Sequence, residues 1–121
     1  MGWEDGPMTD CLFCSIVGGD IPADVVFRDD DVVAFRDIDP KAPVHVLVIP
    51  TAHHANAADA AAASPELVGR LIEVAGQIAA DEGVADSGYR IVTNTGDEAG
   101  QSVHHLHLHV LGGRTLTWPP G

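Results

Sequence analysis

Basic residues are scarce in this chain. Only 6 Lys and Arg residues stand against 18 Asp and Glu residues in 121, which gives a formal net charge of −12 and a pI near 4.6. Such an acidic surface repels the phosphate backbone of nucleic acids and the headgroups of anionic lipids. We therefore expect no nucleic-acid partner and no membrane partner. A small anionic ligand can bind only where local groups overcome this field.

Cysteine and long apolar segments are also scarce. Cys11 and Cys14 are the only cysteines, too few for a disulfide scaffold. No apolar run approaches the roughly 18 residues that cross a bilayer, and the acidic first ten residues do not resemble a signal peptide. These features predict a cytoplasmic protein. The spacing of the two cysteines leaves metal binding, redox chemistry and simple packing open.

What is present suits one folded domain. The chain has 45% hydrophobic residues and a mean hydropathy of +0.10, and its length matches a single domain of about 100–150 residues. We expect residues 1–10 to be an unpacked extension and residues 11–121 to form the domain. The tail 115–121 contains two consecutive prolines and continues neither a helix nor a strand.

The hydrophobic pattern predicts two helices and five strands. A short N-terminal helix is expected over 11–17, and a long helix runs from the capping Ser64 and Pro65 to Gly83. The strand candidates are 25–28, 32–36, 44–49, 89–94 and 103–111. The strands follow one another without a repeated β-helix-β alternation. This order predicts an α+β fold with a five-stranded antiparallel sheet.

Four of the seven histidines lie in the segment 104–109. Because side chains of a strand alternate between faces, His105, His107 and His109 are expected on one face, and the apolar residues between them on the core face. On a regular strand the outer two histidines lie about 13 Å apart, too far to share one ion. His105 and His107 alone remain able to share a metal.

Chemistry on an anion suits this face better. A neutral imidazole can attack phosphorus with one nitrogen while a hydrogen bond to the other N–H fixes the tautomer. The loop before the histidines contains Gly100, whose backbone approaches a ligand easily, and the hydroxyl of Ser102. Backbone amides and a hydroxyl in such a loop are suited to binding phosphate.

The segment Gly100–Arg114 resembles the signature of the histidine-triad nucleotide-binding proteins, in which three histidines alternate with apolar residues. The resemblance covers essentially residues 11–121. It includes Ile21-Pro22, the stretch 34–50, Gly88-Tyr89-Arg90, Asn94 and the ending Trp118-Pro-Pro-Gly121. This ending is similar to that of the purine nucleoside phosphoramidase branch.

The resemblance implies a hydrolase that cleaves P–N bonds of adenosine or guanosine 5′-phosphoramidates. His107 would be the nucleophile and would form a nucleotidyl-histidine intermediate. His109 and Ser102 would bind the phosphate and the leaving group, with help from the amides of Gly100 and Gln101. His45 and His105 would support the nucleophile.

The resemblance also implies a nucleotide pocket and an assembly. Asp37 and Ile38 would contact the ribose and the purine, and Asn94 would line the phosphate site. The base pocket would be walled by four residues that core packing explains equally well: Leu12, Phe13, Ile16 and Phe35. The family forms homodimers in which the two sheets join, and Trp118 of one subunit would close the site of the other.

Bacterial members of this family with a Cys-x-x-Cys pair bind zinc, which implies a structural Zn²⁺ held here by Cys11, Cys14, His53 and His105. Two other functions stay open. One is hydrolysis of dinucleoside polyphosphates, an activity of another branch with the same triad. The other is a nucleotide-binding or interaction module with little turnover.

Overall fold

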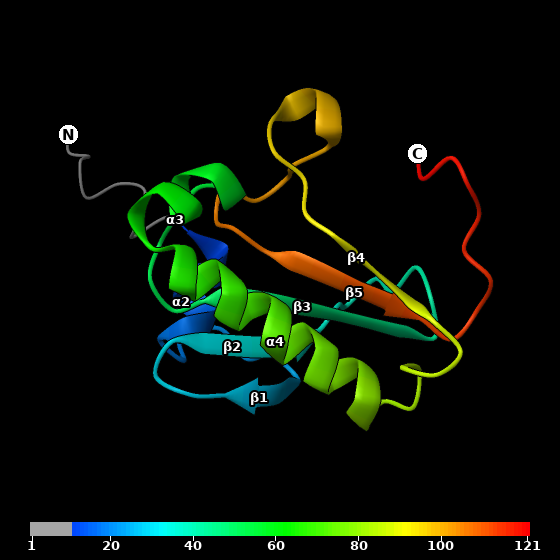
Figure 1. The fold of residues 1–121 in the computed structure, drawn as a ribbon. Coiled ribbons are helices and arrows are strands. Elements are labelled where there is room, and N and C mark those ends of the chain that lie inside the picture. Colours follow the sequence, from blue (N-terminus) through cyan, green and yellow to red (C-terminus); the bar gives the residue numbers. More distant parts are fainter. Residues whose placement is uncertain (1–10) are drawn as a thin grey trace, which may run out of the picture.

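The computed structural model describes residues 11–121, so the extension expected over residues 1–10 lies outside the described residues. One antiparallel sheet of five strands, in the order β1-β2-β3-β5-β4, forms the centre of the molecule (Figure 1). The strands are β1 (Val25–Arg28), β2 (Val32–Arg36), β3 (Val44–Pro50), β4 (Tyr89–Val92) and β5 (Leu108–Gly112). The helices are α2 (Leu12–Val17), α3 (Ala57–Ala63) and α4 (Pro65–Asp81), with a 3-10 turn η1 (Asp97–Ala99). The expected α+β fold is confirmed.

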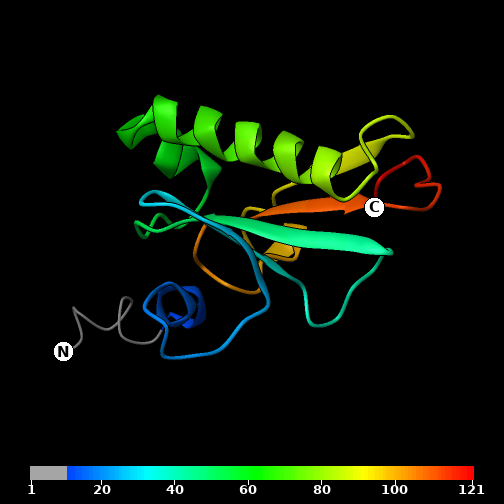
Figure 2. The same cartoon turned by 90° about the horizontal axis from the view of Figure 1, so that it is seen from below.

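The helices cover opposite faces of the sheet. Figure 2 shows α3 and α4 on one face and the short α2 on the other. Neighbouring residues of β2 alternate between the two resulting cores: Val32 packs with Leu71 of α4, and Val33 packs with Phe13 of α2. The strand alternation therefore divides the apolar residues into a larger core under α4 and a smaller one under α2.

The ends of the two predicted helices have local causes. The Ser64 hydroxyl accepts from the Leu67 amide at 3.3 Å, Pro65 occupies the first turn, and Gly83 adopts a φ of +78° just beyond the end of α4. The Cys11 sulfur accepts from the Cys14 amide at 3.3 Å and so begins α2. Both helices agree with the prediction.

The helix α3 was not predicted. Asn56 caps it by accepting from the Asp59 amide at 2.9 Å. Its residues are almost all alanine, which favours helix by propensity but gives no alternation of apolar and polar positions. Hydrophobic periodicity therefore carried no signal for it.

Two predicted strands are too long. The expected strand 103–111 begins only at Leu108, because the Leu106 amide donates to the His54 carbonyl at 2.7 Å instead of joining the β3 ladder. The expected strand 89–94 ends at Val92, and the Thr93 hydroxyl donates to the His107 carbonyl at 2.8 Å. The first two triad histidines therefore lie on a bent segment before β5.

No helix in the described range 11–121 is long and apolar enough to cross a membrane. The tail 115–121 forms neither a helix nor a strand, as expected.

Candidate active site

A cavity of about 340 Å³ opens on the α2 face of the sheet, beside β2 and β5. It is lined by nine of the residues proposed for nucleotide binding: Leu12, Phe13, Ile16, Phe35, Asp37, Ile38, Ser102, His107 and His109. Most of this wall is apolar, and its polar side chains are Arg36, Asp37, Ser102, His107 and His109. A cavity of this size with an apolar wall and few polar groups is typical of a small-molecule site.

His107 lies at the buried end of this cavity with only 5% of its surface exposed. Its Nδ1 atom is 2.7 Å from the His105 carbonyl oxygen. A carbonyl only accepts, so the proton resides on Nδ1 and the lone pair on Nε2. Burial lowers the pKa of His107 below its ordinary value of 6.5, so the imidazole stays neutral. The result is an imidazole with one free lone pair, which is the nucleophilic form.

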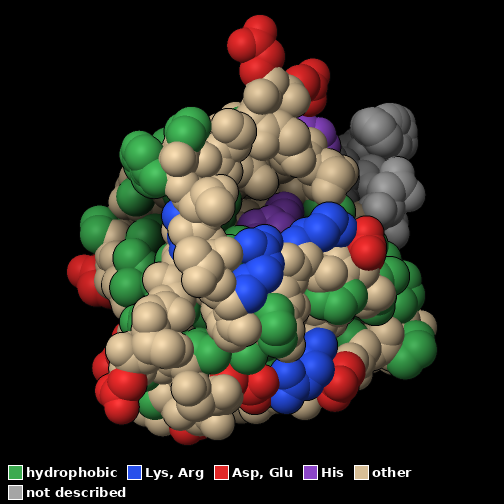
Figure 3. Space-filling model, turned by 90° about the vertical axis from the view of Figure 1, so that its right-hand side faces the viewer, with side chains coloured by type: hydrophobic (Ala, Val, Ile, Leu, Met, Phe, Trp, Pro, Cys, Tyr) green, Lys and Arg blue, Asp and Glu red, His purple; other side chains and the backbone are tan. Residues whose placement is uncertain are grey.

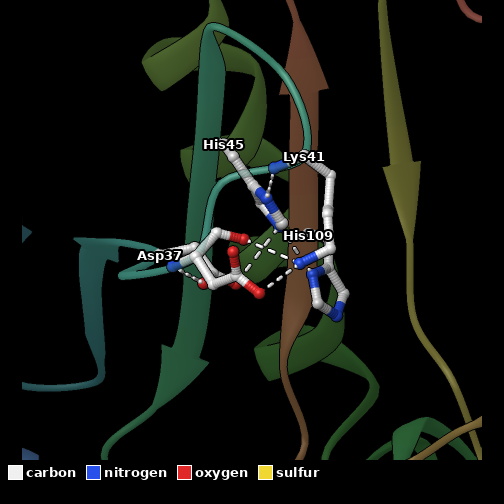
Figure 4. Close-up of polar contacts among 5 residues, drawn as sticks. Asp37, Lys41, His45 and His109 are labelled. Atoms are coloured by element: carbon white, nitrogen blue, oxygen red, sulfur yellow. Dashed lines mark hydrogen bonds and ion pairs between the residues drawn. The ribbon is translucent and has the colours of Figure 1, made fainter.

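In a second pair, His45 and His109, a backbone hydrogen bond fixes which ring nitrogens carry the protons. The Lys41 amide donates to His45 Nδ1 at 3.0 Å, so the proton of His45 is on Nε2. This Nε2 lies 2.9 Å from His109 Nδ1 and 3.4 Å from an Asp37 carboxylate oxygen (Figure 4). His109 Nδ1 thus accepts, and its Nε2–H is a donor available to a ligand. Burial, and then the proximity of His107 and His45, lowers the pKa of His109 to about 4.

The donor atoms of Asp37, His45 and His109 lie within 4.8 Å of one another, a spacing that could hold a metal ion. The hydrogen bond from Lys41 opposes this use. A metal at His45 Nε2 would require the ring proton to move to Nδ1. Because Nδ1 accepts from the Lys41 amide, that proton would then face another N–H donor. We therefore interpret the three residues as a hydrogen-bonded group.

A better metal site lies behind the cavity. The side-chain donor atoms of Cys11, Cys14, His53 and His105 all lie within 4.8 Å of one another. His105 Nδ1 is 3.4 Å from the Cys11 sulfur and 3.6 Å from the Cys14 sulfur, and His53 Nδ1 is 3.3 Å from the Cys14 sulfur. Two sulfurs and two imidazole nitrogens are a donor set that four-coordinate zinc sites use.

The chemistry of these donors also fits a cation. His105 donates from Nε2 to the Pro50 carbonyl at 2.9 Å, which leaves the Nδ1 lone pair directed at the sulfurs. Burial lowers the pKa of His105 to about 4, so that lone pair stays free. Burial, with help from Cys11, raises the pKa of Cys14 to about 12. A divalent cation would favour the thiolate and reverse this shift.

Not every proposed nucleotide-binding residue reaches the cavity. Gly100, Gln101, Asn94 and Trp118 do not line it. The Gln101 side chain is buried, whereas Trp118 is 80% exposed and contributes nothing to the site of its own chain. His45 and His105 also stand outside the cavity wall, and each contacts one of the histidines that line it.

Sequence reasoning missed part of the wall. The cavity also contacts Ile21, Pro22, Ala23, Arg36, Leu47 and Val103. Leu47 could have been found, because it lies two residues from His45 on β3 and therefore on the same face of the strand. The segment 21–23 has no regular structure, and no periodicity points to it.

The histidines lie in a hollow with basic groups at its rim. Figure 3 shows histidine side chains at the bottom of a hollow that Lys and Arg side chains border. The Arg114 guanidinium donates to the Lys41 carbonyl at 3.0 Å, which places both cations at the loop that orients His45. The chain carries a net charge of −12, and the Lys41 ammonium is paired with the Asp39 carboxylate at 2.6 Å. Arg114 is therefore the cation of the two that offsets the repulsion of an anion locally.

Comparison with known proteins agrees with this geometry. The family model described as HIT domain matches residues 18–116. The chain is 52% identical over 112 residues to an uncharacterized HIT-like protein of Synechococcus elongatus, covering 93% of this chain and 97% of that protein. It is 47% identical over 105 residues to the purine nucleoside phosphoramidase of Escherichia coli, covering 87% of this chain and 88% of that protein.

A solved structure agrees as well. The crystal structure of a HIT family hydrolase from Legionella pneumophila superposes with a TM-score of 0.89 at 50% identity, covering 92% of this chain and 99% of that one. Sequence and structure relatives therefore share the fold over nearly the full length. The chain belongs to the HIT domain family.

Proposed function

We propose that this chain is a purine nucleoside phosphoramidase. Its reaction would be hydrolysis of the P–N bond of an adenosine or guanosine 5′-phosphoramidate to the nucleoside monophosphate and an amine. The observation that carries the proposal is the fixed tautomer of His107, which has its lone pair on Nε2 at the end of the cavity. The Escherichia coli relative named for this activity supports it.

The first step is attack of His107 Nε2 on phosphorus. A bond forms between Nε2 and phosphorus, the P–N bond breaks, and the leaving nitrogen takes a proton from solvent and departs as the amine. The ring then carries a positive charge, which the hydrogen bond from Nδ1–H to the His105 carbonyl stabilises. Water next attacks the phosphorus of the nucleotidyl-histidine and gives up a proton to solvent. The bond between Nε2 and phosphorus breaks, which releases the nucleoside monophosphate and restores neutral His107.

The surrounding groups have separate tasks in this scheme. His109 would donate from Nε2 to a phosphate oxygen, since its Nδ1 accepts from His45. Ser102 lines the same cavity and would donate to a phosphate oxygen beside the leaving nitrogen. The carboxylate of Asp37 and the fully exposed Ile38 stand at the mouth, where the ribose and purine would lie. Phe13 and Phe35 form an edge-on aromatic pair, with ring centroids 5.5 Å apart, that would bound the base.

We propose zinc as a structural ion at Cys11, Cys14, His53 and His105. Four protein donors saturate a tetrahedral ion and leave no position for substrate. When bound, the ion would link α2 to the segment that carries His107. The free thiols of this chain also suit a reducing compartment, which supports the cytoplasmic location that we propose.

We also propose a homodimer in which the tail completes the partner's site. Trp118 is 80% exposed and lies outside the cavity of its own chain. An exposed aromatic side chain is suited to a contact with a second molecule. The two prolines that follow it favour an extended path over a core element.

The test is a side-by-side turnover assay with an adenosine phosphoramidate, a guanosine phosphoramidate and a diadenosine polyphosphate. We expect faster turnover of the phosphoramidates. Preferential cleavage of the diadenosine polyphosphate would indicate the other hydrolase branch instead. Binding of AMP without turnover of any of the three compounds would indicate a nucleotide-binding module.

A further inference from the structure

The loop between β4 and the histidine segment is closed on itself by Gln101. Gly96 and Gly100 have φ angles of +87° and +84°, a region that favours glycine, and the turn η1 lies between them. The backbone N–H of Gln101 donates to the Gly96 carbonyl at 3.1 Å, and the backbone N–H of Gly96 donates to Oε1 of the Gln101 side chain at 2.9 Å. Gly96 and Gln101 thus exchange two hydrogen bonds.

The Gln101 side chain is buried at 7% exposure, although glutamine is usually a surface residue. Its Nε2 group donates to the Ala55 carbonyl at 2.7 Å and to the Val103 carbonyl at 3.1 Å. With the Gly96 contact, three of the four hydrogen bonds that the amide can form are made within the protein. Such a satisfied buried group is a rigid junction between backbone segments.

The segment His53–Ala55 makes three contacts in consecutive positions. His53 contacts the Cys14 sulfur, the His54 carbonyl accepts from the Leu106 amide, and the Ala55 carbonyl accepts from Gln101. The loop 96–102 is therefore attached to the same segment that supports the histidine strand. Gln101 is the side chain that makes this attachment.

Ser102 follows Gln101 directly and lines the nucleotide cavity. Within residues 11–121 its hydroxyl has no hydrogen-bond partner, so its position depends on the backbone on either side. That backbone is held at Val103 by the Gln101 carboxamide, and at Gln101 by the same carboxamide together with the backbone hydrogen bond to the Gly96 carbonyl.

We propose that the Gln101 carboxamide is a positioning residue that sets where Ser102 meets the phosphoryl group, and that it acts through Ser102 without contacting the substrate. This inference rests on the proposed function. The inference gives a role to the side chain of Gln101, whereas the family resemblance implies that the backbone amide of this residue binds phosphate.

The experiment is a double-mutant cycle of Gln101→Glu, Ser102→Ala and the combined variant, with kcat/KM for an adenosine phosphoramidate as the readout. The carboxylate still accepts from Gly96 but repels the Ala55 and Val103 carbonyls. We expect each single change to lower kcat/KM by about tenfold or more, mainly through kcat. The combined variant should be no slower than the slower single variant, because both act on one interaction.

Gln77→Glu is the matched control. Gln77 is the only other glutamine, lies exposed on α4, and its change adds the same charge away from the cavity. It should leave kcat/KM unchanged. Losses that multiply in the combined variant, or wild-type kcat/KM in Gln101→Glu, would overturn the inference.

Hydrogen exchange keeps the test independent of turnover. In Gln101→Glu, faster exchange should be confined to 96–103 and 53–56, with the exchange of α4 unchanged. Should Gln101→Glu fail to fold, Gln101→Met, which keeps the length of the side chain and removes its hydrogen bonds, takes its place in both measurements. Faster exchange throughout the protein would overturn the inference by showing that Gln101 serves global stability.

A wild-type protein that binds AMP but hydrolyses no phosphoramidate would defeat the proposed function alone. The inference is then tested by AMP affinity, which should fall about tenfold or more in Gln101→Glu and stay unchanged in Gln77→Glu. Unchanged AMP affinity in Gln101→Glu, or a wild-type protein that binds no AMP, would overturn it.

Discussion

His105 fixes the proton of His107 through its backbone while its own side chain faces the cysteines. The His105 carbonyl accepts from His107 Nδ1 at 2.7 Å, and His105 Nδ1 lies 3.4 Å from the Cys11 sulfur. The ring and the carbonyl of one residue thus belong to two different sites. A change in the cysteine cluster can therefore reach the nucleophile through the backbone of His105, and also through Phe13 of α2, whose ring centroid lies 5.0 Å from that of His107.

Replacing the nucleophile should abolish turnover and preserve binding. His107→Gly is expected to lower kcat by on the order of 10³-fold or more, because the covalent step loses its attacking atom. AMP affinity, measured by calorimetry, should change little, since the other groups that line the cavity stay in place. Mass spectrometry of acid-quenched wild-type enzyme should find the nucleotide on His107.

His104→Ala controls for the loss of an imidazole in the same segment, because His104 is exposed and outside the nucleotide cavity. It should keep wild-type turnover. A His107→Gly rate within about tenfold of wild type would rule out the covalent mechanism.

Stability should fall as the solution is acidified through the histidine range. The pKa of His109 is about 4 in the folded protein and ordinarily 6.5, so the unfolded chain binds this proton first as the pH falls. The stability from the neutral ring is complete above pH 6.5 and is lost between 6.5 and about 4. The loss is about 2 kcal/mol after allowing for the partial exposure of the ring.

Urea unfolding at several pH values checks this expectation. The difference in unfolding free energy between about pH 7.5 and pH 5 should be smaller in His109→Asn than in wild type. His104→Asn, which removes an exposed imidazole, should behave like wild type. An equal pH dependence in all three proteins would show that His109 is not the group that titrates.

The metal proposal has two neighbouring histidines as test and control. His53 lies 3.3 Å from the Cys14 sulfur, whereas the His54 ring is not part of the four-residue cluster. Native mass spectrometry should find about one zinc ion per chain in wild type and in His54→Ala. The ion should be lost from His53→Ala and from the Cys11→Ala, Cys14→Ala double variant.

The metal-free variants should be less stable than wild type by several degrees in Tm, because a bound ion stabilises only the folded chain. Turnover of the folded fraction should fall less than stability does. Protein purified without chelator that contains no metal would favour packed thiols. Activity lost on chelation and regained with zinc, at constant fold, would instead indicate a catalytic metal.

The tail can be tested by truncation before Thr115. The truncated chain should remain folded and dimeric, because the tail adds no helix or strand to the domain. Its selectivity among phosphoramidates of different amines should change, as the proposed position of Trp118 at the partner's site requires. Trp118→Ala should reproduce this change, with sedimentation to check the dimer. A monomeric or unfolded product would mean that the tail is structural.

Sequence patterns were sufficient where one local rule decides the structure. The hairpin over 25–28 and 32–36 has the predicted bounds, since Asp29 closes the turn by accepting from the Asp31 and Val32 amides at 2.8 Å. The alternation of histidine and apolar residues also puts Leu106 and Leu108 into the core under α4. The alternation of faces that is typical of a strand therefore already applies at Leu106, which comes before the first residue of β5 that pairs with β3.

Features that depend on single hydrogen bonds outside the regular elements could not be read in this way. The late start of β5 follows from a bond between Leu106 and His54, and the acceptor role of His45 Nδ1 follows from the Lys41 amide. Neither contact has a period or a composition that marks it in the sequence. The side-chain role of Gln101 is of the same kind, because it needs Gly96, Ala55 and Val103 to come together.

The short helix α2 (Leu12–Val17) and its N-cap Cys11 contribute to two different sites. Cys11 and Cys14 stand at the cluster, while Phe13 and Ile16 wall the cavity. Adding or deleting one residue in this segment would rotate everything beyond it by about 100° and displace one group or the other. Ser15 belongs to neither the cluster nor the cavity wall. We therefore expect α2 to tolerate a substitution at Ser15 far better than any change of length. A library of variants would then keep the spacing of this segment more strictly than its composition.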